Sequence, residues 1–206
     1  MEVRIRDARR DDVNLIFGWI VELAEYERAP DHVRGTPELL EQALFGERPS
    51  AEALIAESRD DAESRTDTES RTDAESRTDT ESRTDTESRT DAESWAPAGF
   101  AVFHCTFSTW ECRPGIWLED LYVPPEQRRA GVGAALIAQL ARITVERGYT
   151  RLQWAALDWN VLALDFYDKI GATRLHEWRI HRLDGEALAR VAAGAGVPRV
   201  APRGYA

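Results

Sequence analysis

Residues 116–133 read IWLEDLYVPPEQRRAGVG, an apolar run followed by two prolines, two arginines and two glycines. This order predicts a strand, a short loop and the start of a helix. The first N–H groups of such a helix have no partner within it and point, with the positive end of the helix dipole, toward the loop. Gly131 and Gly133 leave the backbone open to a ligand, and Arg128 and Arg129 add positive charge. The stretch therefore predicts a site for a phosphate group.

Two well-known glycine loops do not fit this stretch. A Walker A loop ends in Gly-Lys-Ser or Gly-Lys-Thr, whereas Gly133 is followed by two alanines. A dinucleotide-binding loop needs a third Gly or Ala where Leu136 stands, and an acidic residue near Gln153. On these residues alone, a tight turn that opens an amphipathic helix is an equally good interpretation, so the flanking sequence has to decide.

Length and charge suggest one mildly acidic domain. The chain has 206 residues, enough for a core of its own, and a formal net charge of −11. Residues 57–94 hold seven Glu, seven Asp and six Arg, a net charge of −8, so the remaining 168 residues carry −3. The low pI therefore gives no reason to expect basic partners. A nucleic-acid partner is disfavoured because the basic residues are dispersed.

The sequence shows no apolar run of membrane-spanning length and no leader with a charged and then an apolar part at Met1. These features predict a cytoplasmic protein without a membrane partner. Cys105 and Cys112 are expected to be reduced, and no Cys or His spacing suggests a metal site.

Residues 57–94 consist of a six-residue repeat, Glu-Ser-Arg-Thr-Asp followed by Thr or Ala. A period of six matches neither a helix nor a heptad, and the unit holds no large apolar residue, which also excludes a solenoid. The segment is expected to be a disordered insertion between two strands, with a binding tail as the alternative. Residues 194–206 are expected to be a frayed tail of the single domain.

Before the repeat, alternation and apolar spacing predict an edge strand, two helices and a second strand. The first helix is expected to be capped by Asp11 or Asp12 and to end at Pro30. Its apolar stripe comprises Leu15, Ile16, Trp19, Ile20 and Leu23. The other elements are expected at Val3–Arg6, Pro37–Phe45 and Ala53–Ala56.

After the repeat, a strand at Phe100–Phe107 is expected to pair antiparallel with Ala53–Ala56, and Pro114-Gly115 signals a turn. The helix after the glycine loop is expected to run to about Gly148. The later elements are a strand at Arg151–Leu157, a helix from a cap at Asp158 or Asn160 to Lys169, stopped by Gly171, a hairpin of Thr173–Leu175 and Trp178–Leu183, and a helix from Asp184 to about Ala193. The order predicts an α/β fold with a mixed, mostly antiparallel sheet, one parallel crossover and flanking helices.

Several motifs together resemble one enzyme family. They are Glu22-Leu-Ala-Glu-Tyr-Glu27, Arg113-Pro-Gly-Ile-Trp-Leu-Glu-Asp120, Arg128-Arg-Ala-Gly-Val-Gly133, Phe166-Tyr167 with Gly171-Ala172, and Trp178-Arg179. The chain resembles the GNAT N-acetyltransferases, in particular the diamine (spermidine/spermine) acetyltransferase branch and its relatives that act on thialysine-like amines. The resemblance runs from Val3 to about Ala192 and leaves out the repeat.

The resemblance implies acetyl-coenzyme A as co-substrate and a central strand that is bulged and splays from its neighbour. The pyrophosphate would lie on the amides of the glycine loop, and further cofactor contacts would open the helix after Asn160. The implied cofactor-binding residues are Leu121, Tyr122, Val123, Arg128, Arg129, Ala130, Gly131, Val132, Gly133, Ala134, Asn160, Val161, Leu162 and Ala163. No metal is implied.

The resemblance also implies catalytic roles for Tyr167 and Glu119. Tyr167 matches the family's general acid; the alternative is a core aromatic, for which Phe166 is the better candidate. Glu119 matches a carboxylate that binds the amine and could act as a base through water. Glu119 and its neighbour Asp120 point to opposite faces of a regular strand, so Asp120 is treated as secondary.

The first-helix acids, taken alone, favour a solvated face, but the resemblance makes Tyr26 and Glu27 substrate contacts. The implied substrate-binding residues are Tyr26, Glu27, Glu119, Asp120, Gln153, Trp154 and Ala155. The predicted function is direct acetyl transfer to a diamine, polyamine or thialysine-like amine. Alternatives are another acceptor (a protein lysine, an amino acid or an aminoglycoside) or a non-catalytic sensor of coenzyme A. Family members are commonly dimers, so a homodimer is expected.

Overall fold

The computed structural model describes residues 1–59 and 95–195. The chain divides between Ala155 and Ala156 into two compact units, each described here by itself. The first unit holds β1 (Glu2–Asp7), α1 (Val13–Tyr26), α2 (Pro37–Phe45), β2 (Glu52–Arg59), β3 (Ala96–Ser108), β4 (Arg113–Tyr122), α3 (Val132–Glu146), β5 (Leu152–Gln153) and short 3₁₀ helices at Arg10–Asp12, Pro30–His32 and Pro125–Gln127. The second holds α4 (Val161–Lys169) and α5 (Gly185–Ala192).

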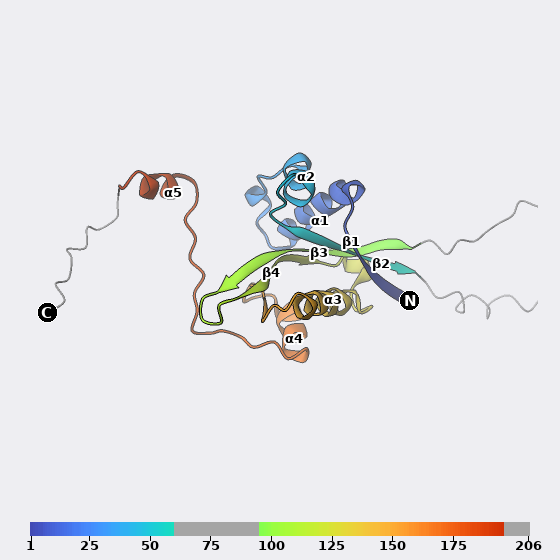
Figure 1. The fold of residues 1–206 in the computed structure, drawn as a ribbon. Coiled ribbons are helices and arrows are strands. Elements are labelled where there is room, and N and C mark those ends of the chain that lie inside the picture. Colours follow the sequence, from blue (N-terminus) through green and yellow to red (C-terminus); the bar gives the residue numbers. More distant parts are fainter. Residues whose placement is uncertain (60–94, 196–206) are drawn as a thin grey trace, which may run out of the picture. The chain divides into compact units, whose positions relative to one another are not determined.

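The strands of the first unit form one sheet in the order β1-β2-β3-β4-β5. The first four pair antiparallel, and β4 and β5 pair parallel across the α3 connection. Helices α1 and α2 cover one face of this sheet and α3 covers the other (Figure 1). The predicted fold class, a mixed and mostly antiparallel sheet with one parallel crossover, is therefore confirmed.

The core lies between the sheet and α1. Ile16 and Trp19 of the predicted stripe are buried there, and Leu15, Ile20 and Leu23 pack against them partly buried. The Trp19 ring stacks on Phe100 of β3 with ring centroids 5.9 Å apart and planes 7° apart. On the other face, Val132, Leu136 and Leu140 of α3 are fully or almost fully buried. The predicted stripe of α1 and the apolar face of α3 therefore lie against the two faces of the sheet.

Strand β4 is bulged and opens away from β5. Val102 of β3 lies opposite Asp120, but the next residue, Phe103, lies opposite Leu118, so Glu119 has no partner across the ladder. The ladder between β4 and β5 consists of Ile116 with Leu152 and Trp117 with Gln153. The end of β4 therefore has backbone groups that its parallel neighbour does not pair, which confirms the bulged and splayed strand implied by the resemblance.

Strand β2 continues three residues beyond the predicted end at Ala56. Glu57 pairs with Arg4 of β1, and Ser58 pairs with Val3. The predicted start of the insertion at Glu57 is therefore wrong, because ion pairs with β1 hold these polar residues in the sheet. Residues 60–94 of the predicted insertion and 196–206 of the predicted tail lie outside the described residues.

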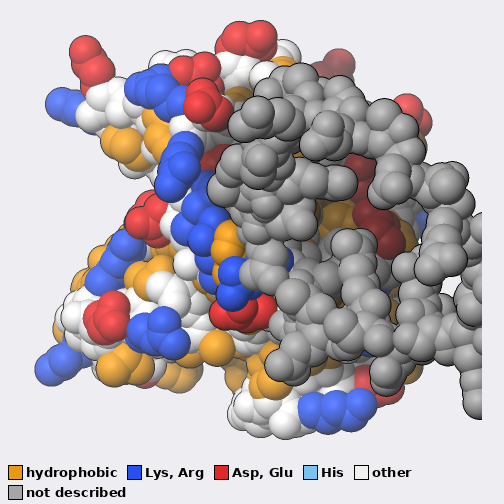
Figure 2. All heavy atoms as spheres, turned by 90° about the vertical axis from the view of Figure 1, so that its right-hand side faces the viewer, with side chains coloured by type: hydrophobic (Ala, Val, Ile, Leu, Met, Phe, Trp, Pro, Cys, Tyr) orange, Lys and Arg blue, Asp and Glu red, His pale blue; other side chains and the backbone are white. Residues whose placement is uncertain are grey.

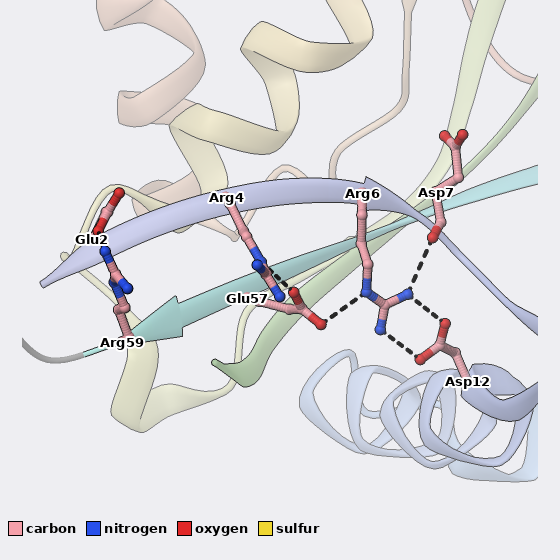
Figure 3. A network of polar contacts seen from close by, with 7 residues as sticks. All are labelled: Glu2, Arg4, Arg6, Asp7, Asp12, Glu57 and Arg59. Atoms are coloured by element: carbon pink, nitrogen blue, oxygen red, sulfur yellow. Dashed lines mark hydrogen bonds and ion pairs between the residues drawn. The ribbon is translucent and has the colours of Figure 1, made fainter. Parts of the chain in front are cut away.

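The charged residues that hold β1 to β2 form a network around Arg6 (Figure 3). Arg6 donates to both carboxylate oxygens of Asp12 at 2.7 and 2.8 Å and to Glu57 at 2.8 Å. Arg4 donates to the other oxygen of Glu57 at 2.6 Å. Asp12 also accepts from the backbone N–H of Arg9 at 2.7 Å and makes no side-chain cap bond to α1. Asp12 is the N-cap residue of α1, one of the two predicted positions, but its carboxylate serves this network instead of the helix N–H groups.

Charged side chains of both signs also lie on the surface of the molecule. On the face drawn in Figure 2, basic and acidic side chains of the described residues are interspersed. In the first unit, ion pairs also join Arg59 to Glu2, Arg10 to Glu41, and Arg147 to Glu52. These pairs link strands and helices that are far apart in the sequence.

The turn predicted at Pro114-Gly115 is wrong. Both residues belong to β4, and the chain turns instead at 109–112, where Cys112 has a φ of +50°. A Cβ on Gly115 would lie 2.8 Å from Cγ and 2.9 Å from the carbonyl oxygen of Arg151. The glycine therefore serves the close approach of two chain segments rather than a turn.

Two strand predictions after α3 also fail. The strand expected at Arg151–Leu157 is reduced to the two residues of β5, and residues 173–183, expected as a hairpin, contain no strand. A strand needs a partner, and residues 173–183 pair with no strand in the part of the chain that is described. The C-terminal helices agree better: Asn160 caps α4, Gly171 follows its end with a φ of +84°, and α5 begins after Asp184.

Candidate active site

The glycine loop forms the start of α3. Gly131 is the N-cap residue with a φ of +85°, a left-handed conformation that favours glycine. The first helical hydrogen bond runs from the Ala135 N–H to the Gly131 carbonyl at 2.9 Å, so the N–H groups of 132–134 lie in the free first turn. Arg129 also has a positive φ, of +67°, and its side chain is exposed. This geometry suits an anion, as the sequence predicts.

A glycine that the sequence analysis missed holds this loop against the sheet. A Cβ on Gly99 of β3 would lie 2.7 Å from the Tyr122 carbonyl oxygen and 3.2 Å from the Val132 side chain. Any larger residue would push the end of β4 or the start of α3 away. The only available signal was a glycine at the start of a strongly apolar strand.

Arg128 and Arg129 differ in how they are held. Arg128 is half-buried, and its Nε donates to the Val123 carbonyl at 3.0 Å, just past the end of β4. Its guanidinium also lies over the rings of Tyr26 and Tyr122. Of the two predicted basic residues, Arg128 is thus the one with a fixed place beside the loop.

The charges of Glu27 and Glu119 affect the pKa of Asp120. Asp120 is half-buried, and burial, followed by the negative charges of Glu119 and Glu27, raises its pKa to about 6. Partial desolvation also raises the pKa of Glu27 above its ordinary value. The fold thus brings Glu27, which follows α1, near the bulge of β4, where it forms an acidic cluster with Glu119 and Asp120.

Glu119 and Asp120 lie in different surroundings. The Glu119 side chain is 57% exposed, accepts a hydrogen bond from the Trp117 indole at 2.8 Å and lies 3.8 Å from His104 Nε2. Asp120, treated as secondary in the sequence, is the acid with the larger loss of solvent. The bulge between them interrupts the regular alternation of side chains, which the sequence argument assumed.

The three residues predicted on the next strand are only partly in the sheet. Gln153 pairs with Trp117 in the parallel ladder, two residues before Glu119. Trp154 is half-buried and Ala155 is exposed, and both follow the end of β5. Gln153 therefore stands nearest in register to the acids of β4.

The second unit holds the remaining predicted residues. The Asn160 side chain accepts from the Ala163 N–H at 3.2 Å, and the Val161 N–H donates to the Trp159 carbonyl at 2.9 Å. The Asn160 N–H also donates to the Leu157 carbonyl at 2.9 Å, so three of the four amides predicted to meet the cofactor here have partners within the chain. The Val161 and Leu162 side chains are exposed.

Tyr167 is half-buried in α4, and its ring lies 5.3 Å from that of Phe166 at an angle of 53°. Burial raises the pKa of Tyr167 above its ordinary value, so the phenol keeps its proton at neutral pH. A protonated phenol is the form that a general acid requires.

Fold and residues together define an acyltransferase. A family model described as the Acetyltransferase (GNAT) family matches residues 51–172, and the chain belongs to that family. A thialysine N-epsilon-acetyltransferase of Bos taurus is 32% identical over 193 residues, which is 92% of this chain and 97% of that protein. An L-ornithine N5-acetyltransferase of Arabidopsis thaliana is 37% identical over 91 residues, 44% of this chain and 40% of that protein.

Among solved structures, an integron cassette protein from the mobile metagenome of V. cholerae superimposes with a TM-score of 0.62. It is 22% identical, and the match covers 93% of this chain and 98% of that one, so it supports the fold.

The described residues lack two further features. Within 1–59 and 95–195, no helix has the length and apolar character needed to cross a membrane. The same ranges hold no group of three or more His, Cys, Asp or Glu arranged to bind a metal ion.

Proposed function

We propose that the protein transfers an acetyl group from acetyl-coenzyme A directly to a primary amine of a small cationic substrate. The observation that carries the proposal is the acidic cluster of Glu27, Glu119 and Asp120 at the bulge of β4, the strand that leads into the glycine loop. A cluster of carboxylates attracts a cation, and the adjoining anion site suits the diphosphate of the coenzyme. Acetyl-coenzyme A, when bound, would supply the activated acetyl thioester.

The residues of the loop fit such a ligand. Gly131 provides the left-handed turn, the first amides of α3 would bind the diphosphate, and Arg128 would add a fixed positive charge. The backbone of Leu121, Tyr122 and Val123 has no partner on the β5 side of the sheet and would bind the pantetheine arm there, as an added strand would.

Amine attack requires that the ammonium group lose a proton. We favour Asp120 as the proton acceptor, directly or through water, because its raised pKa of about 6 lies closer to neutral pH than that of an ordinary carboxylate. Glu27 and Glu119 would hold the cation. Tyr167 would donate a proton to the departing thiolate, which its raised pKa supports because the phenol is protonated at neutral pH.

The names of the relatives favour a particular acceptor class. Relatives named for thialysine and for L-ornithine point to amino acids that carry a second amine, and diamines and polyamines present the same cationic end without the carboxylate. We therefore place basic amino acids first and diamines second. A panel of both classes, assayed for thiol release with a chromogenic reagent, would rank them.

The test of the proposed chemistry is Tyr167→Phe. Loss of a general acid lowers kcat by about 10²-fold or more while the affinity for coenzyme A stays near that of the wild type. Tyr149→Phe is the matched control, because Tyr149 lies just after the C-terminal end of α3, at the opposite end of that helix from the glycine loop. Full turnover of Tyr167→Phe at saturating cofactor would disprove the assigned acid. Tight cofactor binding without acetylation of any amine would favour a sensor.

We also propose that the protein is a cytoplasmic homodimer. The second unit supports this because Trp178, Ile180, Leu183 and Leu188 are large apolar side chains that are more than half exposed. Large apolar side chains left exposed to water are commonly covered where an interface forms. Sedimentation equilibrium would measure the mass, and a monomer at micromolar concentration would contradict the proposal.

A further inference from the structure

Arg128 lies against two tyrosine rings from different parts of the first unit. Its Cζ atom is 5.0 Å from the ring centroid of Tyr26, the last residue of α1, and 5.9 Å from that of Tyr122, the last residue of β4. Its Nε donates to the Val123 carbonyl at 3.0 Å. One hydrogen bond and two aromatic faces thus restrict the plane of a guanidinium that would otherwise be free to rotate.

The Tyr122 ring is itself held by α1. It is 5% exposed, and its hydroxyl donates to a carboxylate oxygen of Glu22 at 2.9 Å. Burial and then the Glu22 carboxylate raise the pKa of Tyr122 to about 12, so this donor keeps its proton at any physiological pH. Glu22 and Tyr26 are four residues apart on one helix and therefore share a face. The last turns of α1 thus reach Arg128 in two ways: Tyr26 contacts it directly, and Glu22 holds the Tyr122 ring that contacts it.

The orientation of Arg128 matters for an anion. With Nε bound to the Val123 carbonyl, the terminal N–H groups are those that the fixed plane can offer to a ligand beside the loop. A planar, pre-oriented guanidinium binds phosphate better than a mobile one, because less conformational entropy is lost on binding.

We propose that Tyr26 is a positioning residue for Arg128, supported by Glu22 through Tyr122, and that it contributes to binding of the coenzyme's phosphates. This inference rests on the proposed coenzyme site at the glycine loop. It assigns to the cofactor side a tyrosine that the sequence placed among the amine contacts, and it adds Glu22, which the sequence left on a solvated face. Glu27, the next residue after Tyr26, stays with the amine.

The experiment compares Tyr26→Leu with Tyr26→Phe by isothermal titration with coenzyme A and by steady-state kinetics. Loss of the ring raises the Kd for coenzyme A and the KM for acetyl-coenzyme A by about 3- to 10-fold, the range expected for one cation–π contact. Phe keeps the ring and restores the affinity to within about twofold. The KM for the amine stays within about twofold in both variants, since neither removes a carboxylate.

Three further measurements separate positioning from other roles. S-acetyl-pantetheine lacks the diphosphate, so its KM is expected to be the same in Tyr26→Leu and the wild type. The double variant with Arg128→Gln is expected to bind coenzyme A no more weakly than Arg128→Gln alone, because Tyr26 acts through Arg128. Glu22→Gln, a change at an exposed position, is expected to weaken coenzyme A binding by a smaller factor without changing the amine KM.

Glu27→Gln is the matched control, with a raised amine KM and an unchanged Kd for coenzyme A. The inference is overturned if Tyr26→Leu raises the amine KM while the Kd for coenzyme A is unchanged, or if Tyr26→Phe is as impaired as Tyr26→Leu. Wild-type protein that binds no coenzyme A would refute the proposed function itself, and that result is visible before any variant is made.

Discussion

Two groups of carboxylates in the first unit have opposite electrostatic environments. Around β1 and β2, Asp12 and Glu57 each bind arginine, and Figure 3 shows the guanidinium of Arg6 between them. At the end of β4, Asp120 faces Glu27 and Glu119, and its pKa is raised by burial and by those two charges. The same residue types thus stabilise the fold in one place and oppose it in the other.

The pKa values show the difference directly. The hydrogen bonds from Arg6 hold the pKa of Asp12 below its ordinary value. Burial alone would raise the pKa of Glu57, but the bonds from Arg6 and Arg4 outweigh it and leave the pKa lowered. Asp120 has no such compensation and titrates at about 6. A bound cationic ligand would supply the positive charge that this cluster lacks.

The largest effect is expected from Glu57→Gln. This change leaves Arg4 and Arg6 without their shared carboxylate, whose side chain is 10% exposed, and it lowers the free energy of unfolding by about 2–3 kcal/mol at pH 7. Urea denaturation measures it. Because the pKa of Glu57 is lowered on folding, its contribution is present above about pH 4 and is lost as the pH falls through its folded-state pKa.

Glu41→Gln is the matched control for that variant. Glu41 pairs with Arg10 on the surface, with both side chains largely exposed, so its loss costs less than about 1 kcal/mol. Equal destabilisation by the two variants would contradict a special role for the network at β1 and β2.

Asp120→Asn is expected to have the opposite sign. The folded-state pKa of about 6 lies above the unfolded value, so ionisation destabilises the fold as the pH rises through these two values. The variant is therefore more stable than the wild type by about 2 kcal/mol at pH 7 and equally stable near pH 4. Asp12→Asn, the same chemical change in the paired cluster, is destabilising at pH 7. A loss of stability in both variants would refute the contrast.

The same Asp120 variant tests the site. In the wild type the amine KM is expected to rise as the pH falls below about 6, because protonation of Asp120 removes a charge that attracts the cation. Asp120→Asn has a raised amine KM at pH 8 and lacks this inflection. An unchanged inflection in the variant would assign it to another group.

The smallest effect is expected from Trp95→Leu at the edge of the paired cluster. The Trp95 ring lies 4.2 Å from Cζ of Arg4 and 4.8 Å from that of Arg59. Loss of these contacts lowers the free energy of unfolding by about 0.5–1 kcal/mol in urea denaturation. Trp110→Leu, at an 86% exposed position, changes it by less than about 0.5 kcal/mol. A Trp95 effect no larger than the Trp110 effect would show that these contacts are immaterial.

Much of the fold follows from local patterns. The strand, glycine loop and helix at 116–146 and the apolar stripe of α1 are predicted from residues close together in the sequence. The failures include the turn at 114–115, the end of β2, and the strands expected at 151–157 and 173–183. Pro and Gly are turn formers, but at 114–115 the approach of Arg151 decides the conformation. Residues 173–183 were expected to form a hairpin, yet local sequence cannot provide the pairing partner that a strand needs.

The candidate site divides in the same way. The residue types at Glu119, Asp120 and Gly131 were evident from the sequence and the family resemblance. The roles of Gly99 and Glu22 were not, because each depends on Tyr122, which lies 23 residues from one and 100 from the other. Nor could the sequence decide which neighbouring acid loses more solvent, because the bulge at Glu119 breaks the alternation on which that choice relied.

By itself, the sequence determined the class of this protein through a family resemblance that several motifs carry together, whereas the glycine loop alone left two interpretations open. Only the tertiary structure decided the electrostatics. The pKa of Asp120 depends on Glu27, which lies at the end of a helix from the other part of the chain, and Arg128 is oriented by Tyr26 of the same helix. Burial and charge–charge interaction depend on distances in space. These residues come close together only when α1 packs on the sheet.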